Sequence, residues 1–176
     1  MTATAVNLSS SAAAPVHTIS MLVRNKPGVL VRVSLVCSRR GYNIESLVVS
    51  PDVVDGEFSR MTVTCSGDLE TLEQIIKQCT KLIDVVHAID HTGQEVISTE
   101  IALVKLRCPL NRRTEILQIA EQYNAKVVDY GTDSLIVRVY GASDKVDAFV
   151  SLARQFEIVE LVRSGKILMT RGPETT

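Results

Sequence analysis

A short turn-forming segment at residues 25–30 (NKPGVL) has the residue types best suited to bind a small anion. Pro27 favours the first turn of a helix, because proline lacks the N–H that would have no partner there. Gly28 has no side chain, so a ligand can approach its backbone closely. The unpaired N–H groups of a helix N-terminus, with the helix dipole behind them, attract a carboxylate or a phosphate. An ordinary turn that only starts a helix is the alternative, since every such junction has free N–H groups.

Other residues that could do chemistry form weaker patterns. Asp129 and Asp133 flank a predicted turn, where carboxylates usually accept local hydrogen bonds, and a general acid–base pair is the less favoured alternative. His87 and His91 are four residues apart, but they fall at the end of a strand pattern rather than on a helix, so metal binding is also less favoured. Nucleophile, phosphate-loop and dinucleotide motifs are absent. We therefore predict no catalytic residue and no metal site.

The four cysteines are widely spaced and lie within apolar patterns. None forms a C-x-x-C pair, so buried free thiols are favoured over zinc ligands or disulfides. The four positions are Cys37, Cys65, Cys79 and Cys108.

The composition indicates a globular chain without a nucleic-acid partner. The 176 residues are 45% hydrophobic and 22% charged, enough to build a core in one large or two small domains. A net charge of −1, the absence of Trp and an aromatic content of 4% argue against binding nucleic acid or an anionic membrane. No apolar run approaches the roughly 20 residues of a membrane span.

The first residues have the composition of a tail. Residues 1–15 (MTATAVNLSSSAAAP) are small and polar, and they lack the basic start and apolar run of a secretory signal. They also lack Arg, which weakens a transit-peptide interpretation but leaves a plastid location open. We predict a mobile tail on a soluble, cytoplasmic protein.

The turn at residues 25–30 lies between a strand and a helix. Before it, Ile19, Met21 and Val23 alternate with polar positions, and after it Val33 and Cys37 continue an apolar stripe of helical spacing. Strand patterns follow at residues 42–50 and 58–65, then a helix stripe over 69–79 and a strand over 82–89. The predicted order is βαββαβ.

The same order repeats in the second half. Strand patterns at residues 101–106, 125–130, 135–140 and 156–163 alternate with helix patterns at 111–123 and 143–153. The fold class is therefore α+β, with two tandem ferredoxin-like βαββαβ units and antiparallel sheets. We predict domains at residues 16–93 and 99–172, joined by a polar connector at 94–98.

Each predicted unit leaves one sheet face without a helix. A unit of roughly 75 residues is too small to cover both faces. The predicted outward positions of the first unit include Leu47, Val49, Thr62 and Thr64, and they are only partly polar. We therefore expect a second sheet or chain against this face, and at least a dimer.

The segment NKPGVL, followed by a helix and RGYNIESL, resembles the ACT domain of the small, regulatory subunit of acetohydroxyacid synthase (acetolactate synthase). The resemblance continues through FSRMTVTCSGD, LEQIIKQCTKLIDVV, TEIALVKL and LVRSGKILMTRG, from His17 to Gly172. Residues 97–100 (ISTE) and 139–141 (VYG) depart from the family pattern, which affects details of the second domain.

The resemblance implies a regulatory subunit without catalytic activity of its own. Members of this family bind and activate a separate thiamine-diphosphate-dependent subunit, which condenses pyruvate with pyruvate or 2-oxobutyrate. They also make that enzyme inhibitable by an end product, usually valine. Thiamine diphosphate, Mg²⁺ and FAD, where present, would belong to the catalytic large subunit, and no cofactor is expected in this chain. A stand-alone amino-acid-responsive regulator is the alternative.

The resemblance also implies an effector site at the interface of an ACT-domain homodimer. The valine carboxylate would meet the N–H groups that follow Pro27, and Asn25 would hydrogen-bond the ligand. Asn43 would contribute an amide from the facing subunit, although a plain turn residue after Gly41 is the alternative. The predicted effector-binding residues are Asn25, Pro27, Gly28, Val29, Leu30, Asn43 and Ile44.

Overall fold

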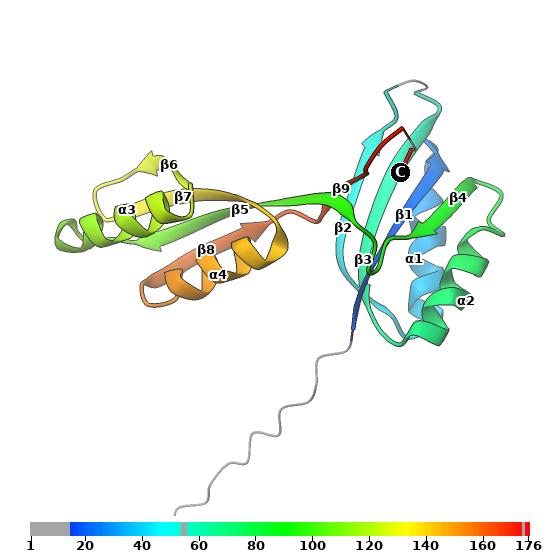
Figure 1. Cartoon of the computed structure of the whole chain (residues 1–176), viewed down its shortest axis with the longest axis horizontal. Helices are drawn as coiled ribbons and strands as arrows, with labels where there is room; N and C mark the ends of the chain where they lie inside the picture. Colours follow the sequence, from blue (N-terminus) through cyan, green and yellow to red (C-terminus); the bar gives the residue numbers. More distant parts are fainter. Residues whose placement is uncertain (1–14, 54–55, 174) are drawn as a thin grey trace, which may run out of the picture.

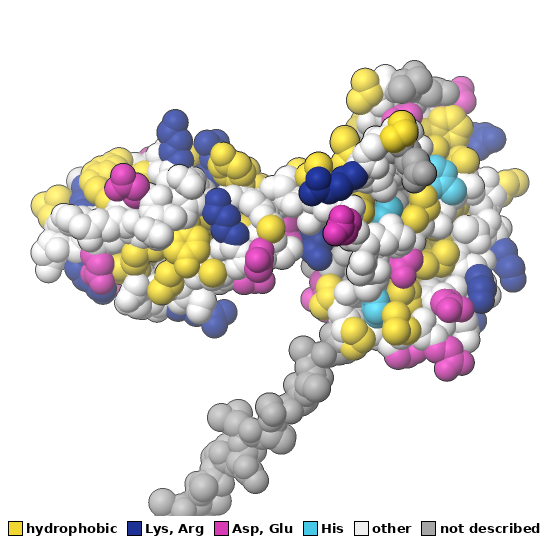
Figure 2. All heavy atoms as spheres, viewed as in Figure 1, with side chains coloured by type: hydrophobic (Ala, Val, Ile, Leu, Met, Phe, Trp, Pro, Cys, Tyr) yellow, Lys and Arg dark blue, Asp and Glu magenta, His cyan; other side chains and the backbone are white. Residues whose placement is uncertain are grey.

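The computed structural model describes residues 15–53, 56–173 and 175–176, and it forms two lobes joined by a narrow waist (Figures 1 and 2). The predicted tail lies outside the described residues, apart from Pro15, whose carbonyl accepts a hydrogen bond of 3.1 Å from Gly67 N–H. The first lobe comprises β1 (Val16–Arg24), α1 (Val29–Arg39), β2 (Asn43–Pro51), β3 (Phe58–Ser66), α2 (Leu69–Cys79) and β4 (Val85–Asp90).

The second lobe repeats this order and adds a strand. It comprises β5 (Val96–Arg107), the 3₁₀ turn η1 (Leu110–Arg112), α3 (Arg113–Gln122), β6 (Lys126–Tyr130), β7 (Ser134–Gly141), α4 (Ser143–Ala153), β8 (Glu157–Arg163) and β9 (Ile167–Thr170). The predicted α+β class with two tandem βαββαβ units is confirmed. Among the described residues, no helix combines the length and apolar character needed to cross a membrane.

The first lobe is an antiparallel sheet of order β2-β3-β1-β4 with α1 and α2 packed on one face (Figure 1). The alternation in β1 places Ile19, Met21 and Val23 in the core, where each is at most 3% exposed. Residues three and four apart on each helix complete this core. The helix residues of the core are Val29, Val33, Cys37, Leu72, Ile75 and Cys79.

The predicted alternation of β2 is wrong beyond its second residue. A register shift between Ile44 and Ser46 opposite β3 places Glu45 in a bulge. A bulge inserts one residue and reverses which face the following side chains occupy. Leu47 therefore pairs with Val63 and packs against the helix-side core, instead of facing outward with Thr62 and Thr64.

The second lobe has the sheet order β6-β7-β5-β8, with all neighbours antiparallel. Its core contains Leu106, Ile116, Leu135 and Phe149, each at most 2% exposed. The ring of Tyr123 meets Phe149 edge-on with centroids 5.7 Å apart. The second unit thus has a core of its own, separate from that of the first.

The two lobes are linked by β5, which is longer than predicted. It begins at Val96, so residues 96–98 are strand rather than the predicted polar connector. These residues pair with β9, a strand absent from our prediction, in the register Val96↔Thr170 to Thr99↔Ile167. The rest of β5 lies in the second sheet.

The C-terminal segment lies over the open face of the first sheet. A Cβ on Gly165 would approach the Ser46 side chain at 3.0 Å, and Arg60 Nη1 donates a hydrogen bond to the Thr176 carbonyl. Thr18, Ser20 and Thr64 on this face are only 5–6% exposed. Part of the cover that we expected from a second sheet or chain is therefore supplied by the same chain.

Close packing at Gly67 gives the first prediction. A Cβ at this position would lie 2.5 Å from Cε2 and 2.7 Å from Cε1 of Tyr42, a residue that is only 6% exposed and whose hydroxyl donates to the Asp68 carbonyl. We expect Gly67→Ala to lower the free energy of unfolding by about 1–3 kcal/mol, measured by urea denaturation. Gly56→Ala is the control, because its added Cβ meets no atom within 4 Å. Equal stability of the two variants would contradict this packing.

Candidate functional site

The predicted anion-binding turn has the expected backbone geometry. Gly28 is the N-cap of α1 and has the left-handed φ of +84°, which strains any residue with a side chain. The Arg32 N–H donates a 3.2 Å hydrogen bond to the Gly28 carbonyl, and this is the first helical hydrogen bond of α1. The N–H groups of Leu30 and Val31 precede that bond, so they have no acceptor within the helix. The turn thus presents helix N-terminal donors beside a residue without a side chain.

The predicted residue Asn25 is tied to the β2–β3 hairpin. Its backbone N–H donates to the Glu57 carbonyl at 2.7 Å, and its side-chain Nδ2 donates to the Gly56 carbonyl at 3.3 Å. The side-chain Oδ1 is an acceptor that these bonds do not use. Asn25 is therefore held in place and can offer an acceptor to an ammonium group.

Two cationic side chains lie at the turn. Arg32 Nη2 forms a 2.5 Å ion pair with Asp84 Oδ2, and Arg32 Nη1 lies 3.6 Å from where a Cβ on Gly28 would stand. Lys26 is exposed within the turn itself. The Arg32 charge is paired with Asp84, so Lys26 is the cation that adds to the N-terminal end of the helix dipole, and the turn favours a carboxylate.

The remaining predicted residues of the turn have different roles. The Val29 side chain is 3% exposed and belongs to the core, so only its backbone faces the turn, and its N–H approaches the Lys26 carbonyl at 3.4 Å. Leu30 is 43% exposed, and Leu35 further along α1 is 46% exposed. The outer face of α1 is therefore partly apolar.

Asn43 and Ile44 lie at the opposite end of α1. Asn43 begins β2, is exposed, and donates from Nδ2 to Glu45 Oε1 at 3.1 Å, whereas Ile44 is half-buried against the core. Both line a surface pocket with Ser34, Leu35, Ser38, Gly41 and Tyr42. An 11-residue helix is about 16 Å long at 1.5 Å per residue, so one chain does not bring Asn43 to the Gly28 turn.

Three of the less favoured candidates, His91, Asp129 and Asp133, have ordinary structural surroundings, whereas His87 Nε2 is buried without a hydrogen-bond partner among the described residues. His91 is buried and shares hydrogen bonds with Ser20 Oγ at 2.7 Å and Gln94 Oε1 at 3.1 Å. Asp129 and Asp133 are both exposed on the β6–β7 hairpin. Within the part of the chain that the structure describes, no three His, Cys, Asp or Glu side chains gather as metal ligands.

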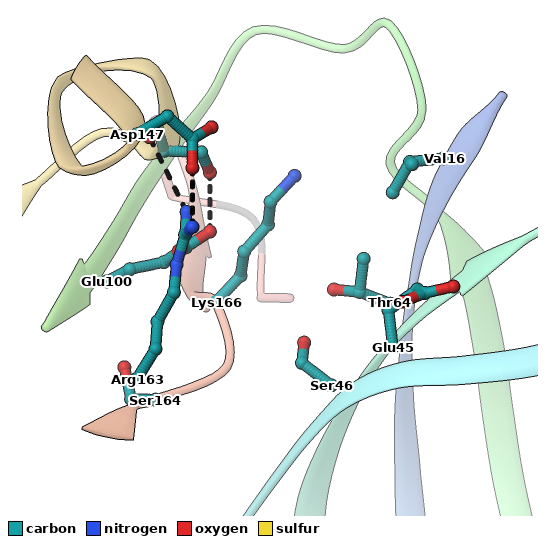
Figure 3. A pocket seen from close by; sticks show the side chains of 10 residues that line it. Val16, Glu45, Ser46, Thr64, Glu100, Asp147, Arg163, Ser164 and Lys166 are labelled. Carbon is teal, nitrogen blue, oxygen red and sulfur yellow. Dashed lines mark hydrogen bonds and ion pairs between the residues drawn. The ribbon is translucent and has the colours of Figure 1, made fainter. Parts of the chain in front are cut away.

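A pocket between the two lobes was not predicted from the sequence. Arg163 at the end of β8 forms 2.5 Å ion pairs with Glu100 of β5 and Asp147 of α4 (Figure 3). Burial lowers the pKa of Arg163, but hydrogen bonds to Asp147 and Glu100 outweigh it and raise the pKa above its ordinary value. Ser46 and Thr64 of the first lobe form the facing wall. Only the LVRSGKIL segment pointed to this region, and its residue types alone do not reveal a cavity.

The fold and the turn define a class of protein, one with an ACT domain followed by a second ferredoxin-like unit. Residues 19–87 match a family model described as an AHAS small subunit-like ACT domain, and residues 99–172 match one described as the small subunit of acetolactate synthase. The chain therefore belongs to the acetolactate synthase small subunit family, as its sequence motifs indicated.

Individual relatives span nearly the whole chain. A probable acetolactate synthase small subunit of Archaeoglobus fulgidus is 45% identical, covering 89% of this chain and 97% of its own. An acetolactate synthase small subunit of Mycolicibacterium smegmatis is 40% identical, and the match covers 90% of this chain and 93% of that protein. The crystal structure of the Thermotoga maritima acetolactate synthase small subunit superposes with a TM-score of 0.80 at 35% identity, covering 91% of this chain and 99% of that one.

The buried cysteines give the second prediction. All four described thiols are free and buried, and burial raises the pKa of Cys65 and of Cys79 to about 12. At pH 8 only about one in ten thousand of these two thiols would be ionised, and the thiolate is the reactive form. We expect a disulfide reagent at pH 8 to label the folded protein at least about a hundredfold more slowly than the denatured protein.

An exposed position provides the control for this labelling. Ser151→Cys on the surface of α4 should react rapidly in the folded protein. Rapid labelling of Cys65 or Cys79 without denaturant would contradict their burial.

Proposed function

We propose that this chain binds and activates the catalytic large subunit of acetolactate synthase and confers feedback inhibition by valine. Membership of the small subunit family and the N-terminal ACT domain make the chain a regulatory subunit. In this proposal thiamine diphosphate, Mg²⁺ and any FAD belong to the catalytic partner. The present chain contributes ligand sensing and no chemistry.

One observation carries the proposal of an effector site. Gly28 holds a left-handed conformation directly before α1, and the helix donors behind it are flanked by Lys26 and Arg32. The backbone N–H groups after Pro27 would bind the carboxylate of the amino acid, as a helix N-terminus binds anions. Asn25 Oδ1 would accept from its ammonium group.

Strand topology supports a second chain at this site. β2 is an edge strand of the first sheet, and it runs parallel to β1 because both are antiparallel to β3. If β2 pairs antiparallel with β2 of a second copy, the twofold axis also places α1 beside the partner copy's α1, in the opposite direction. The partner's Asn43 and Ile44 then approach the Gly28 turn, which they cannot reach within one chain.

Inhibition requires valine to prefer one quaternary state. A ligand shifts an equilibrium only through its different affinities for the two states. A valine held between Gly28 of one chain and Asn43 of the other would favour the state in which the two ACT domains are clamped together. We propose that this state holds the catalytic subunit in a less active arrangement.

Acetolactate formation by the cognate catalytic subunit, with and without this chain and across a valine titration, tests the function directly. Activation followed by valine-dependent inhibition is expected. Activation without valine inhibition would retain the partner and exclude valine as effector. An unchanged rate at every valine concentration would refute the subunit proposal and favour a stand-alone amino-acid-responsive regulator.

Substitutions at the turn give the third prediction. Gly28→Asp forces a side chain into φ +84° and adds a negative charge where the carboxylate would bind. We expect it to raise the half-inhibitory valine concentration at least about tenfold while the catalytic subunit is still activated. Asn25→Ala should raise it about tenfold.

The control for strain is Gly93→Asp, at an exposed turn with φ +73°. This variant should retain the valine response of the wild type. Normal valine sensitivity of both Gly28→Asp and Asn25→Ala would show that the effector binds elsewhere.

The homodimer gives the fourth prediction. Leu35 is 46% exposed on the face of α1 that lies beside Asn43 and Ile44, so in the proposed dimer it would be buried. Leu35→Glu would bury a charge there, and we expect the dimer to dissociate at concentrations about a hundredfold higher in sedimentation velocity. The matched control is Leu69→Glu, because Leu69 is 63% exposed on the other helix. Equal dissociation of both variants would exclude this face of α1 from the interface.

A further inference from the structure

The pocket between the lobes has walls from both halves of the chain and a volume of about 480 Å³ (Figure 3). The first lobe contributes Ser46 of β2 and Thr64 of β3, which are neighbours across the two strands. The second lobe contributes the ion-paired group around Arg163, and Lys166 reaches in from the segment between β8 and β9. This pocket is separate from the Gly28 turn and from the pocket beside Asn43.

On the second-lobe wall, the charges are already paired. Arg163 Nε and Nη1 lie 2.5 Å from Glu100 Oε2 and Asp147 Oδ1, and Ser143 Oγ donates to Glu100 Oε1 at 2.5 Å. A guanidinium held by two carboxylates has little remaining capacity for a ligand anion. This wall is polar, but its charges are paired with one another, so it is not the anion-binding element.

The first-lobe wall presents a hydroxyl group without a partner. Thr64 is only 5% exposed, and its Oγ1 has no hydrogen-bond partner within the described part of the chain. A buried polar atom without a partner costs free energy, and such an atom in a native structure calls for a ligand or water to satisfy it. Figure 3 shows the Ser46 and Thr64 side chains on the wall that faces Lys166.

Lys166 supplies a cation that is not neutralised in the pocket. Considering residues 15–53, 56–173 and 175–176, no carboxylate oxygen lies within the 4.0 Å ion-pair distance of its ammonium group. Its side chain extends into the space between the two walls (Figure 3). One ammonium and two hydroxyl groups together form a set of donors that suits an anion.

We propose that this interdomain pocket binds a small organic carboxylate, held by Lys166 from one side and by the hydroxyl groups of Ser46 and Thr64 from the other. The ligand would satisfy the Thr64 hydroxyl and pair the Lys166 charge in one step. Because these groups come from different lobes, occupancy would also tie the first lobe to the segment that leads into β9. The site shares no residue with the effector site proposed above, although Glu45 on its wall accepts a hydrogen bond from Asn43.

The surrounding charges favour a monoanion over phosphate. Three carboxylates (Glu45, Glu100 and Asp147) and two cations line the pocket, so its net charge is −1. Hydrogen bonds from Ser66 and then Asn43 lower the pKa of Glu45, so this carboxyl stays ionised at neutral pH. A dianion would be repelled by this excess of negative charge about twice as strongly as a monoanion, and Lys166 can match only one of its two charges.

An amino acid and a 2-oxo acid both carry such a carboxylate, so the fifth prediction uses one probe of each kind. Valine and pyruvate are titrated calorimetrically into the full-length protein and into Gly28→Asp, which removes the turn site. We expect at least one probe to bind the pocket of Gly28→Asp as tightly as it binds the same pocket in the wild-type protein. Lys166→Met should weaken that binding at least about tenfold and Thr64→Val about threefold or more.

Two controls separate the pocket from folding defects and from general charge effects. Lys126→Met removes an exposed lysine on β6 and should leave the affinity unchanged. Thr64→Val removes a buried hydroxyl without a partner, so its melting temperature should equal or exceed that of the wild type. A preference for valine would identify the ligand as an amino acid, and a preference for pyruvate as a 2-oxo acid, and either supports the pocket.

Three results would overturn the proposal. These are failure of both probes to bind Gly28→Asp, equal binding by wild type and Lys166→Met, and tighter binding of inorganic phosphate than of either carboxylate. Each leaves the proposed effector site standing, because that site is judged by the response of Gly28→Asp in the acetolactate assay. Conversely, binding that depends on Lys166 and not on Gly28 would support the pocket even if Gly28→Asp kept its valine inhibition.

Discussion

Two helices cover only one face of a four-stranded sheet, and the open face of the first sheet determines much of how this chain is arranged. Thr18, Ser20 and Thr64 on that face are small and polar, yet they are almost completely buried. The segment after β4 contacts two of them, since Ser20 Oγ shares a hydrogen bond with His91 and the Thr18 N–H donates to Thr92 Oγ1, and the C-terminal segment returns across the sheet with Gly165 against Ser46 and Val48. Since a Cβ on Gly165 would come within 2.8 Å of Val48 Cγ2, the close approach depends on a residue without a side chain.

The return of the C-terminal segment also fixes the link between the lobes. β5 pairs with β9 at its start and with β7 and β8 over the rest of its length, so one strand of 12 residues runs from the link into the second sheet. Any change in the angle between the lobes must bend this strand or break its pairing with β9. The pocket lined by Ser46, Thr64 and Lys166 lies beside this link, so a ligand bound there would also affect the angle between the lobes.

Periodicity in the sequence was sufficient for the order of elements and for most of the core. Ile19, Met21 and Val23 alternate as a half-buried strand must, and the structure buries all three. Leu47 was misassigned because the bulge at Glu45 reverses the alternation, and a bulge depends on the partner strand rather than on its own residues. β9 was missed because four residues with a partner at the far end of β5 leave almost no periodic pattern.

The candidate sites differ in how far sequence can define them. The Gly28 turn is local, since proline, glycine and a following helical stripe specify it within a few residues, and the observed φ of +84° agrees with the choice of glycine. The interdomain pocket depends instead on Ser46, Thr64 and Lys166, which come from three distant parts of the chain and meet only through the return of the C-terminal segment. Their residue types are common on protein surfaces, and only the burial of Thr64 Oγ1 distinguishes them.

The position of Asn43 adds an argument about quaternary structure. The Asn43 amide lies about one helix length away from the Gly28 turn, so in a monomer it cannot contact a ligand bound at that turn. The antiparallel pairing of two β2 edges would bring each Asn43 to the Gly28 turn of the other chain, producing two equivalent sites from one contact. Ligand binding and assembly would then be linked by necessity, because each site would be complete only in the dimer. An amino acid that stabilises the dimer must, by the same linkage, bind more tightly as the dimer forms.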